Sequence, residues 1–219
     1  TVFGNAQIDT AQSQFGGAAA SFDGSGDYLH SPDSDDWELG TTHDTWTIEW
    51  WQYLTALPNT YKGILGHQQE GGGTSIGWGA YISNTNKLTF AGSTTSFASG
   101  ATTLSANQWQ HCAIVRQGST LKYYVDGALD YTNTGYTDKT DSVNRNLAIG
   151  YAFNVAGGYN GALYFPGRID ELRISHTARY TGPFIPHTSA HTNDANTVLL
   201  MHMNGTDGST TFVDDNGVY

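Results

Sequence analysis

Apolar and polar residues alternate with a period of two along most of this sequence, and no segment carries a long apolar stripe at helical spacing. Such alternation is typical of strands that bury one face. The predicted strands are Ala18–Phe22, Thr45–Tyr53, Gly63–His67, Ile76–Ser83, Lys87–Ala91, Gln108–Gln117, Thr120–Val125, Leu147–Tyr151, Gly167–Ser175 and Val198–Met203. Turn residues separate them, and Asp126-Gly127 predicts a type I′ hairpin because both residue types tolerate positive φ. The pattern predicts an all-β, antiparallel protein.

The chain of 219 residues shows no linker-like segment that would divide it. All-β sandwiches commonly reach roughly 200–250 residues as one unit, so we expect residues 1–219 to form a single domain. The only cysteine, Cys112, cannot form an internal disulfide, and its place in an alternating run predicts a buried, unreactive thiol.

Charge and hydropathy exclude two classes of partner. Nine Lys plus Arg against twenty Asp plus Glu give a formal net charge of -11, which repels nucleic acid and anionic lipid surfaces. Apolar runs fall short of the roughly 20 residues that cross a bilayer. We therefore expect neither nucleic acid nor membrane as a partner.

Six segments, taken in order, resemble one fold family. They are Ser21–Leu29, Thr45–Trp51, Trp109–Arg116, Leu121–Gly127, Leu147–Gly150 and Gly167–Ile174. Together they are similar to laminin-G-like jelly rolls of the concanavalin A-like lectin and glucanase group. The resemblance implies an antiparallel two-sheet β-sandwich with loops gathered at the strand ends.

The C-terminal residues 196–219 resemble the opening strand of such domains in bacteriophage structural proteins, and Phe3–Ile8 resembles what would follow that strand. Three arrangements follow. The strand closes its own sheet, begins a neighbouring tandem domain, or is donated to another subunit of a homo-oligomer. The resemblance also implies an extracellular or virion-surface location.

Catalytic carboxylates are not predicted. A glycoside hydrolase needs two carboxyl groups roughly 5 to 9.5 Å apart, and laminarinase-like relatives supply them as Glu-x-Asp-x-x-Glu on one strand. Here Glu49 stands alone, and the adjacent Asp170 and Glu171 should point to opposite faces of their strand. We expect a protein without enzyme activity.

Metal binding is considered for zinc and calcium. The histidines are dispersed at 30, 43, 67, 111, 176, 187, 191 and 202, so zinc is not predicted. The family resemblance implies a structural Ca²⁺ held by Asp23 or Asp27 with Asp170 and backbone carbonyls. Alternatively, the first two are turn residues, and Asp170 pairs with a neighbouring arginine.

Glycan binding needs aromatic faces together with a few amide or carboxylate groups, and loops are the expected place for them. The loop-rich stretches Gly71–Trp78, Asn133–Asn146 and Tyr151–Tyr164 combine these types. The predicted ligand-binding residues are Trp78, Tyr136, Asn154, Tyr159 and Asn160.

These expectations favour a non-catalytic, lectin-like recognition module that binds glycan or a host-surface receptor, in a phage virion appendage or an extracellular adhesin. The alternative is a structural or decoration protein that polymerises through its sheet edges. A glycoside hydrolase is the third hypothesis.

Overall fold

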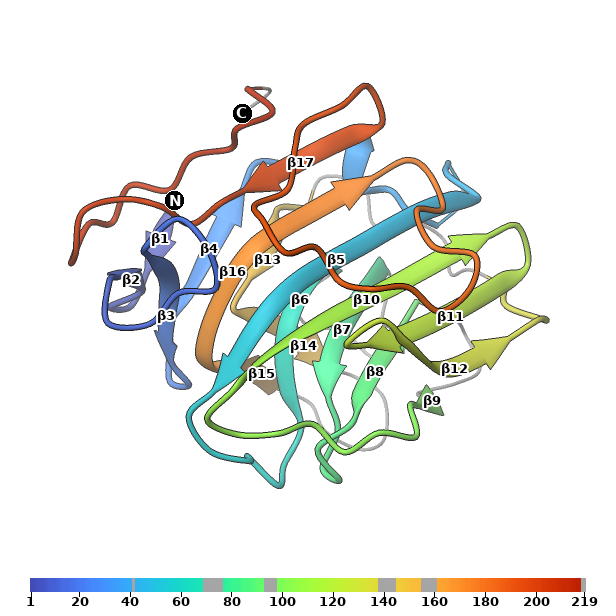
Figure 1. Ribbon diagram of the computed structural model, residues 1–219, viewed down its shortest axis with the longest axis horizontal. Helices are drawn as coiled ribbons and strands as arrows, with labels where there is room; N and C mark the ends of the chain where they lie inside the picture. The colour runs from blue at the N-terminus through green and yellow to red at the C-terminus, as the bar shows by residue number, and fades with distance from the viewer. Residues whose placement is uncertain (41, 69–76, 93–97, 138–144, 155–160, 218–219) are drawn as a thin grey trace.

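A computed structural model of the chain describes residues 1–219 apart from 41, 69–76, 93–97, 138–144, 155–160 and 218–219. The described part is built from two large antiparallel sheets packed face to face (Figure 1). This confirms the predicted all-β sandwich. No helix among the described residues has the length and apolarity that a membrane span requires.

Within the described residues, one sheet has seven strands. In spatial order these are β1 (Val2–Phe3), β4 (Tyr28–Ser31), β13 (Leu147–Ile149), β6 (Lys62–Gln68), β7 (Gly77–Ile82), β8 (Leu88–Ala91) and β9 (Ala98–Ser99). A separate hairpin, β14 (Tyr151–Asn154) and β15 (Gly161–Tyr164), packs on β6.

The other sheet is the eight-stranded one. Its members are β12 (Ala128–Asn133), β11 (Thr120–Val125), β10 (Trp109–Gln117), β5 (Thr45–Leu54), β16 (Pro166–Ser175), β3 (Ala19–Asp23) and β2 (Gln7–Asp9), with β17 (Thr197–Met201) paired to β16. A short 3₁₀ turn, η1 (Asp35–Trp37), connects the two sheets between β4 and β5.

The core lies between the sheets and follows the predicted alternation. On β5, Trp46, Ile48 and Trp50 face inward and are fully buried, while the residues between them face outward. Cys112 on β10 is also fully buried, and burial raises the pKa of its thiol well above the usual value, as expected for an inert core residue.

The hairpin between β11 and β12 has the predicted turn. Asp126 and Gly127 both adopt positive φ, of 50° and 76°, and Val125 pairs directly with Ala128. These dihedral angles match the twist of the flanking strands, so the two-residue loop sets the register of the pair.

The C-terminal strand β17 pairs with β16 of its own chain. The first half of β16 pairs with β3 and the second half with β17, on the same side of the strand. Leu199 and Met201 of β17 enter the core, and the chain that follows β17 returns toward the N-terminal residues, where Phe212 and Val2 line one cleft.

Between the two pairings on β16 lies a β-bulge. Glu171 has a φ of 52°. Asp170 pairs with Trp51 and Arg173 with Glu49, so β16 has one more residue between these two pairs than β5 has. The extra residue changes the predicted orientation of the adjacent carboxylates. Asp170 accepts from the amide of Phe15, and Glu171 from the amide of His191, two segments that pack over the same outer face of the sheet. The expectation of opposite faces was therefore wrong, because a bulge interrupts the period of two.

Candidate functional site

Two of the predicted sugar-stacking residues are core residues. Trp78 on β7 is 2% exposed, its indole Nε1 donates to the Trp37 carbonyl at 2.7 Å, and its ring stacks on Phe90. Tyr136 is 4% exposed and lies beneath the guanidinium of Arg116. Neither ring offers a face on which a sugar could stack, because both have been used to fill the sandwich.

Of the other three predicted residues, the structure describes only Asn154. Asn154 ends β14 and pairs with Gly161 in the backbone ladder. Tyr159 and Asn160 lie outside the described residues.

The predicted calcium ligands do not come together as one set. Asp27 is buried and accepts from the amides of Asn5 at 2.7 Å and Asp23 at 2.8 Å, so Asp23 and Asp27 are neighbours. Asp170 lies four residues further along β16 than Pro166, the residue opposite Asp23, and is bound to the amides of Gln14 and Phe15. Calcium at the Asp23–Asp27 turn stays a prediction, without Asp170.

A continuous group of aromatic rings covers part of the outer face of the seven-stranded sheet. We call it the outer aromatic array; its members are Phe3, Tyr28, His30, Tyr151 and Tyr164. Phe3 stacks on Tyr28 with centroids 4.3 Å apart and planes at 9°. Tyr28 in turn lies 5.2 Å from Tyr151 and 6.2 Å from Tyr164. His30 closes the group, 4.9 Å from Tyr28.

Strand alternation explains why these rings face outward. On β4, Leu29 enters the core, so Tyr28 and His30 on either side of it must point away from the core. On β1, Val2 packs against the core and Phe3 points the other way, with 36% of its surface exposed. Two short strands thus place three rings on one surface.

The β14–β15 hairpin completes the array. It lies flat on β6 because Gly63 has no side chain: a Cβ there would stand 2.2 Å from the Ala152 amide nitrogen. Tyr151 and Tyr164 pair at the base of the hairpin with ring centroids 5.3 Å apart. Close packing on β6 brings this pair against Tyr28.

Polar groups accompany the rings. The exposed Asn146 places its side-chain nitrogen 3.4 Å from Nδ1 of His30. Tyr28, His30 and Tyr164 are half-buried, so each combines a packed body with a solvent-facing part. The surface therefore offers flat apolar faces beside amide, imidazole and phenol groups.

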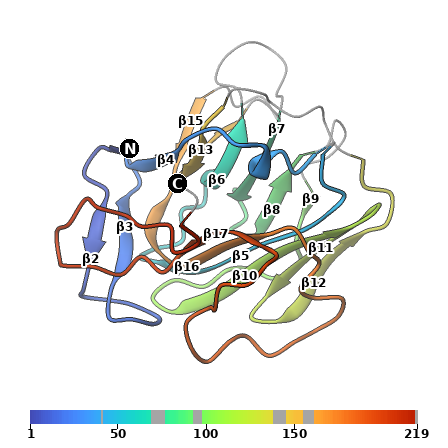
Figure 2. The ribbon, with the colours of Figure 1, turned by 90° about the horizontal axis from the view of Figure 1, so that it is seen from above.

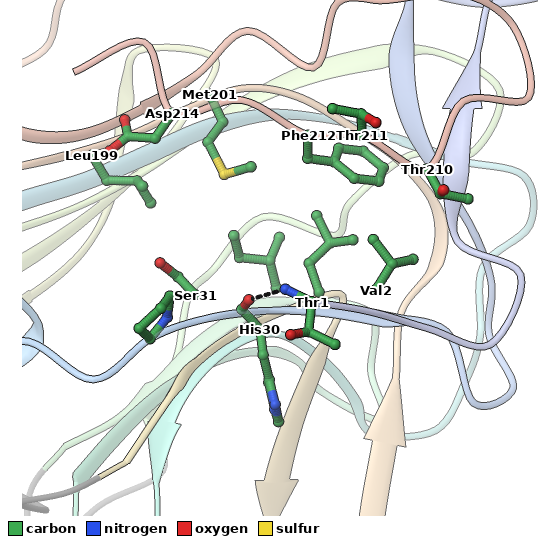
Figure 3. A pocket seen from close by; sticks show the side chains of 13 residues that line it. Thr1, Val2, His30, Ser31, Leu199, Met201, Thr210, Thr211, Phe212 and Asp214 are labelled. Atoms are coloured by element: carbon green, nitrogen blue, oxygen red, sulfur yellow. Dashed lines mark hydrogen bonds between the residues drawn. The ribbon is translucent and has the colours of Figure 1, made fainter. Parts of the chain in front are cut away.

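A cleft of about 490 Å³ opens on the other side of β1 and β4, between the edges of the two sheets. Figure 3 shows Leu199, Met201 and Phe212 along one wall, facing Val2 across the opening. The His30 side chain points away from this cleft, toward the outer aromatic array (Figure 3). The cleft and the array are thus separate features on either side of the same two strands.

The carboxylates that could serve catalysis are buried. Burial by itself would raise the pKa of Glu49, but the hydrogen bond with His111 and the nearby His191 and Arg173 hold it well below its usual range. Burial raises the pKa of Asp170 to about 7, although the amides of Phe15 and Gln14 oppose this. Both side chains lie beneath chain segments rather than in an open groove.

Comparison with known proteins bears on this fold and its surfaces. The sequence profile of the concanavalin A-like lectin/glucanases superfamily, in its laminin G form, matches residues 23–181, which is more than half of the chain. The chain belongs to this superfamily. No curated protein matches it in sequence.

Solved structures share the superfamily fold at low identity. A proposed carbohydrate-binding protein from Bacteroides ovatus superposes with a TM-score of 0.64 at 17% identity, over 91% of this chain and 55% of that protein. A second structure is domain 4 of AbnA, a GH43 extracellular arabinanase from Geobacillus stearothermophilus, in complex with arabinotriose. It superposes with a TM-score of 0.52 at 19% sequence identity, over 80% of this chain and 77% of that domain.

A third solved structure is the Trypanosoma rangeli sialidase in its covalent intermediate form, which superposes with a TM-score of 0.52 at 13% identity, over 74% of this chain and 26% of that chain. This chain spans just over half of the Bacteroides ovatus protein and about a quarter of the sialidase. At these identities the likeness establishes the fold.

Sequence reasoning missed the outer aromatic array, although part of its signal was present. The triplet Tyr28-Leu29-His30 alternates in the sequence and lies in a segment that resembles the family. Phe3 and the Tyr151–Tyr164 pair come from distant parts of the chain, so only the packed sheet brings them next to Tyr28.

Proposed function

We propose that this chain is a non-catalytic recognition module that binds glycan, with the outer aromatic array as its sugar-binding surface. The observation that carries the proposal is the array itself, in which Phe3, Tyr28 and Tyr164 stack in sequence across three strands. Sugars present C–H groups on their flat faces and hydroxyls at their edges. Aromatic faces flanked by a few polar groups match both.

The two structural neighbours support the ligand class. One is a proposed carbohydrate-binding protein, and the other is a domain in complex with arabinotriose. A host-surface receptor that carries glycan would present the same chemistry. The proposal includes an extracellular or virion-surface setting, such as a phage appendage or an adhesin, for which the support is the sequence resemblance of residues 196–219.

The state of the carboxylates supports a binding role over hydrolysis. A general acid needs a raised pKa and contact with the glycosidic oxygen. Glu49 has a depressed pKa and accepts hydrogen bonds from Arg173 and Tyr180. Asp170 has the raised pKa, but its Oδ2 is bound to the amides of Gln14 and Phe15, beneath the N-terminal segment.

A glycan array probed with the purified domain, with calcium and again with a chelator, tests ligand class and metal together. Bound glycans are then titrated against Tyr28→Ala and Tyr164→Ala. We expect each variant to lose affinity about tenfold, because a stacking contact contributes ~0.5–1.5 kcal/mol beyond the area it buries. Binding that requires calcium would support an ion at Asp23 and Asp27.

Tyr53→Ala is the matched control. Tyr53 is also half-buried, but it lies on the eight-stranded sheet beneath the Arg168 guanidinium. Equal losses in all three variants would refute the array as the site. Absence of glycan binding together with concentration-dependent oligomers would favour the assembly hypothesis instead. Release of sugar that disappears in Glu49→Gln would establish a hydrolase.

A further inference from the structure

The outer face of the eight-stranded sheet carries a polar layer that is sealed from solvent. His111 of β10, Glu49 of β5 and Arg173 of β16 all point to this side, away from the core residues between them. The segment 176–196, which joins β16 to β17, crosses over them (Figures 1 and 2). Phe184 of that segment packs edge-on against His111.

Glu49 uses its two oxygens differently. Oε1 accepts two hydrogen bonds from Arg173, at 2.9 Å from Nε and 2.6 Å from Nη2. Oε2 faces the opposite way, toward His111 Nε2 at 3.3 Å, His191 Nε2 at 3.8 Å and the hydroxyl of Tyr180 at 2.6 Å. Oε1 is thus held by Arg173, while Oε2 lies close to the imidazoles of His111 and His191.

His191 is a buried side chain with unmet hydrogen-bonding capacity. Only 1% of its side chain is exposed, and neither ring nitrogen has a hydrogen-bond partner within the described part of the chain. His111 Nδ1 is also unpartnered among these residues. Buried polar groups normally find partners, so an imidazole left without one beside a carboxylate calls for an explanation.

We propose that Glu49 Oε2, His111 Nε2 and His191 Nε2 bind one zinc ion between them. The three side chains offer ligand atoms that all lie within 4.8 Å of one another. A tetrahedral zinc ion with bonds of ~2.0–2.1 Å separates its ligand atoms by about 3.3 Å. The observed separations of 3.3 and 3.8 Å from Oε2 approach that value, so small side-chain shifts would complete the site.

The donor set selects zinc over calcium. Two imidazole nitrogens and one carboxylate oxygen suit zinc and its transition-metal neighbours, whereas calcium needs six or more oxygens. Arg173 would serve as the outer partner that orients the ligating carboxylate, a common arrangement around metal ligands. The second arginine nearby, Arg179, is neutralised by Asp194 at 2.9 Å.

The positive charge of Arg173 limits what the fourth ligand can be. Its guanidinium already balances Glu49, so a divalent ion would favour an anionic fourth ligand such as hydroxide or the phenolate of Tyr180. In either form the fourth ligand gives up one proton to solvent. The ion would fasten the 176–196 segment to the sheet through His191, a role independent of the outer aromatic array.

The test is zinc titration of chelator-treated protein by calorimetry, with elemental analysis after desalting. We expect one zinc per chain, and a loss of at least about 100-fold in affinity for His111→Ala and His191→Ala, since even outer partners of a ligand are worth 10–100-fold. His43→Ala is the control, because it disrupts another close histidine pair, His43 and His176 with centroids 3.6 Å apart. It should retain binding.

A cobalt measurement guards against misfolded variants. His191→Cys should keep the site, bind Co²⁺ and gain a thiolate-to-cobalt charge-transfer band that the wild-type protein lacks, since Cys112 is buried in the core on the other face of the sheet. The proposal is overturned if the wild-type protein binds no zinc, if His43→Ala abolishes binding, or if folded His191→Cys shows no such band.

Discussion

Arg173 and Glu49 lie directly opposite each other on β16 and β5, and two nitrogens of the guanidinium donate hydrogen bonds to the same carboxylate oxygen, Oε1. Both side chains are almost fully excluded from solvent, with exposures of 4% and 0%. The pair joins two central strands of the eight-stranded sheet immediately beside the bulge at Glu171. The polar layer beneath the 176–196 segment is built around it.

Removing one partner of the Arg173–Glu49 pair should destabilise the folded protein. We expect Arg173→Met to lower the free energy of unfolding by about 3–5 kcal/mol, because it leaves the Glu49 charge buried without its main partner. The double variant Glu49→Gln/Arg173→Met should lose less than the single variant, since neither member of the buried ion pair is left charged without its partner. Urea unfolding monitored by tryptophan fluorescence measures both.

Arg168→Met provides the comparison for that experiment. Arg168 pairs with Asp9 at a partly exposed site, where each side chain keeps 16–17% of its surface. We expect Arg168→Met to lower the free energy of unfolding by only about 0–1 kcal/mol. Equal losses in Arg168→Met and Arg173→Met would contradict the distinction between the two ion pairs.

Asp170 should make stability depend on pH in an unusual direction. Burial raises its pKa in the folded protein to about 7 from 3.8, so between these values the folded state holds a proton that the unfolded state has released. Its contribution to stability therefore falls as pH rises through this interval, by up to about 1.4 kcal/mol per pH unit.

Asp170→Asn isolates this contribution, because an amide oxygen can still accept from Gln14 and Phe15 but does not titrate. We expect the stability of the Asp170→Asn variant, relative to the wild-type protein, to increase from pH 4 to pH 7, as followed by urea midpoints. A difference that stays constant across this range would show that Asp170 does not titrate there.

Gly63→Ala should displace the β14–β15 hairpin. The added Cβ would lie 2.2 Å from the Ala152 amide nitrogen, a contact that only backbone movement can relieve. We expect a loss of about 1–3 kcal/mol in stability and weaker glycan binding, because Tyr151 and Tyr164 move with the hairpin. Gly182→Ala has nothing within 4 Å of its new Cβ and should leave both properties unchanged.

Leu199→Ala tests the placement of β17. Leu199 is 1% exposed within the core, so its truncation should cost about 2–5 kcal/mol. Because β17 pairs with β16 of the same chain, the unfolding midpoint should not change with protein concentration. Val213→Ala, at a side chain that is 57% exposed, should stay within about 0.5 kcal/mol. A midpoint that rises with concentration would favour strand donation.

The alternation of the sequence determined most of the fold. The alternation over Thr45–Tyr53 predicted a strand with one buried face, and the alternate residues Trp46 and Trp50 are fully buried on β5. Asp126-Gly127 predicted its hairpin because two positive φ angles are a local property of those residues. The same alternation, applied to Trp78, Ala80 and Ile82, places Trp78 in the core; its position beside a glycine-rich stretch had favoured a loop.

Tertiary structure decided the sites. Tyr28 and Tyr164 are far apart in the chain and become neighbours only because the β14–β15 hairpin folds onto Gly63. His111 and His191 are far apart in the sequence, but the 176–196 segment brings the His191 ring against the His111 ring, beside Glu49. The alternation predicts to which face of the sheet a side chain points. It carries no information about which distant segment will cover that side, because that depends on packing across the whole sandwich.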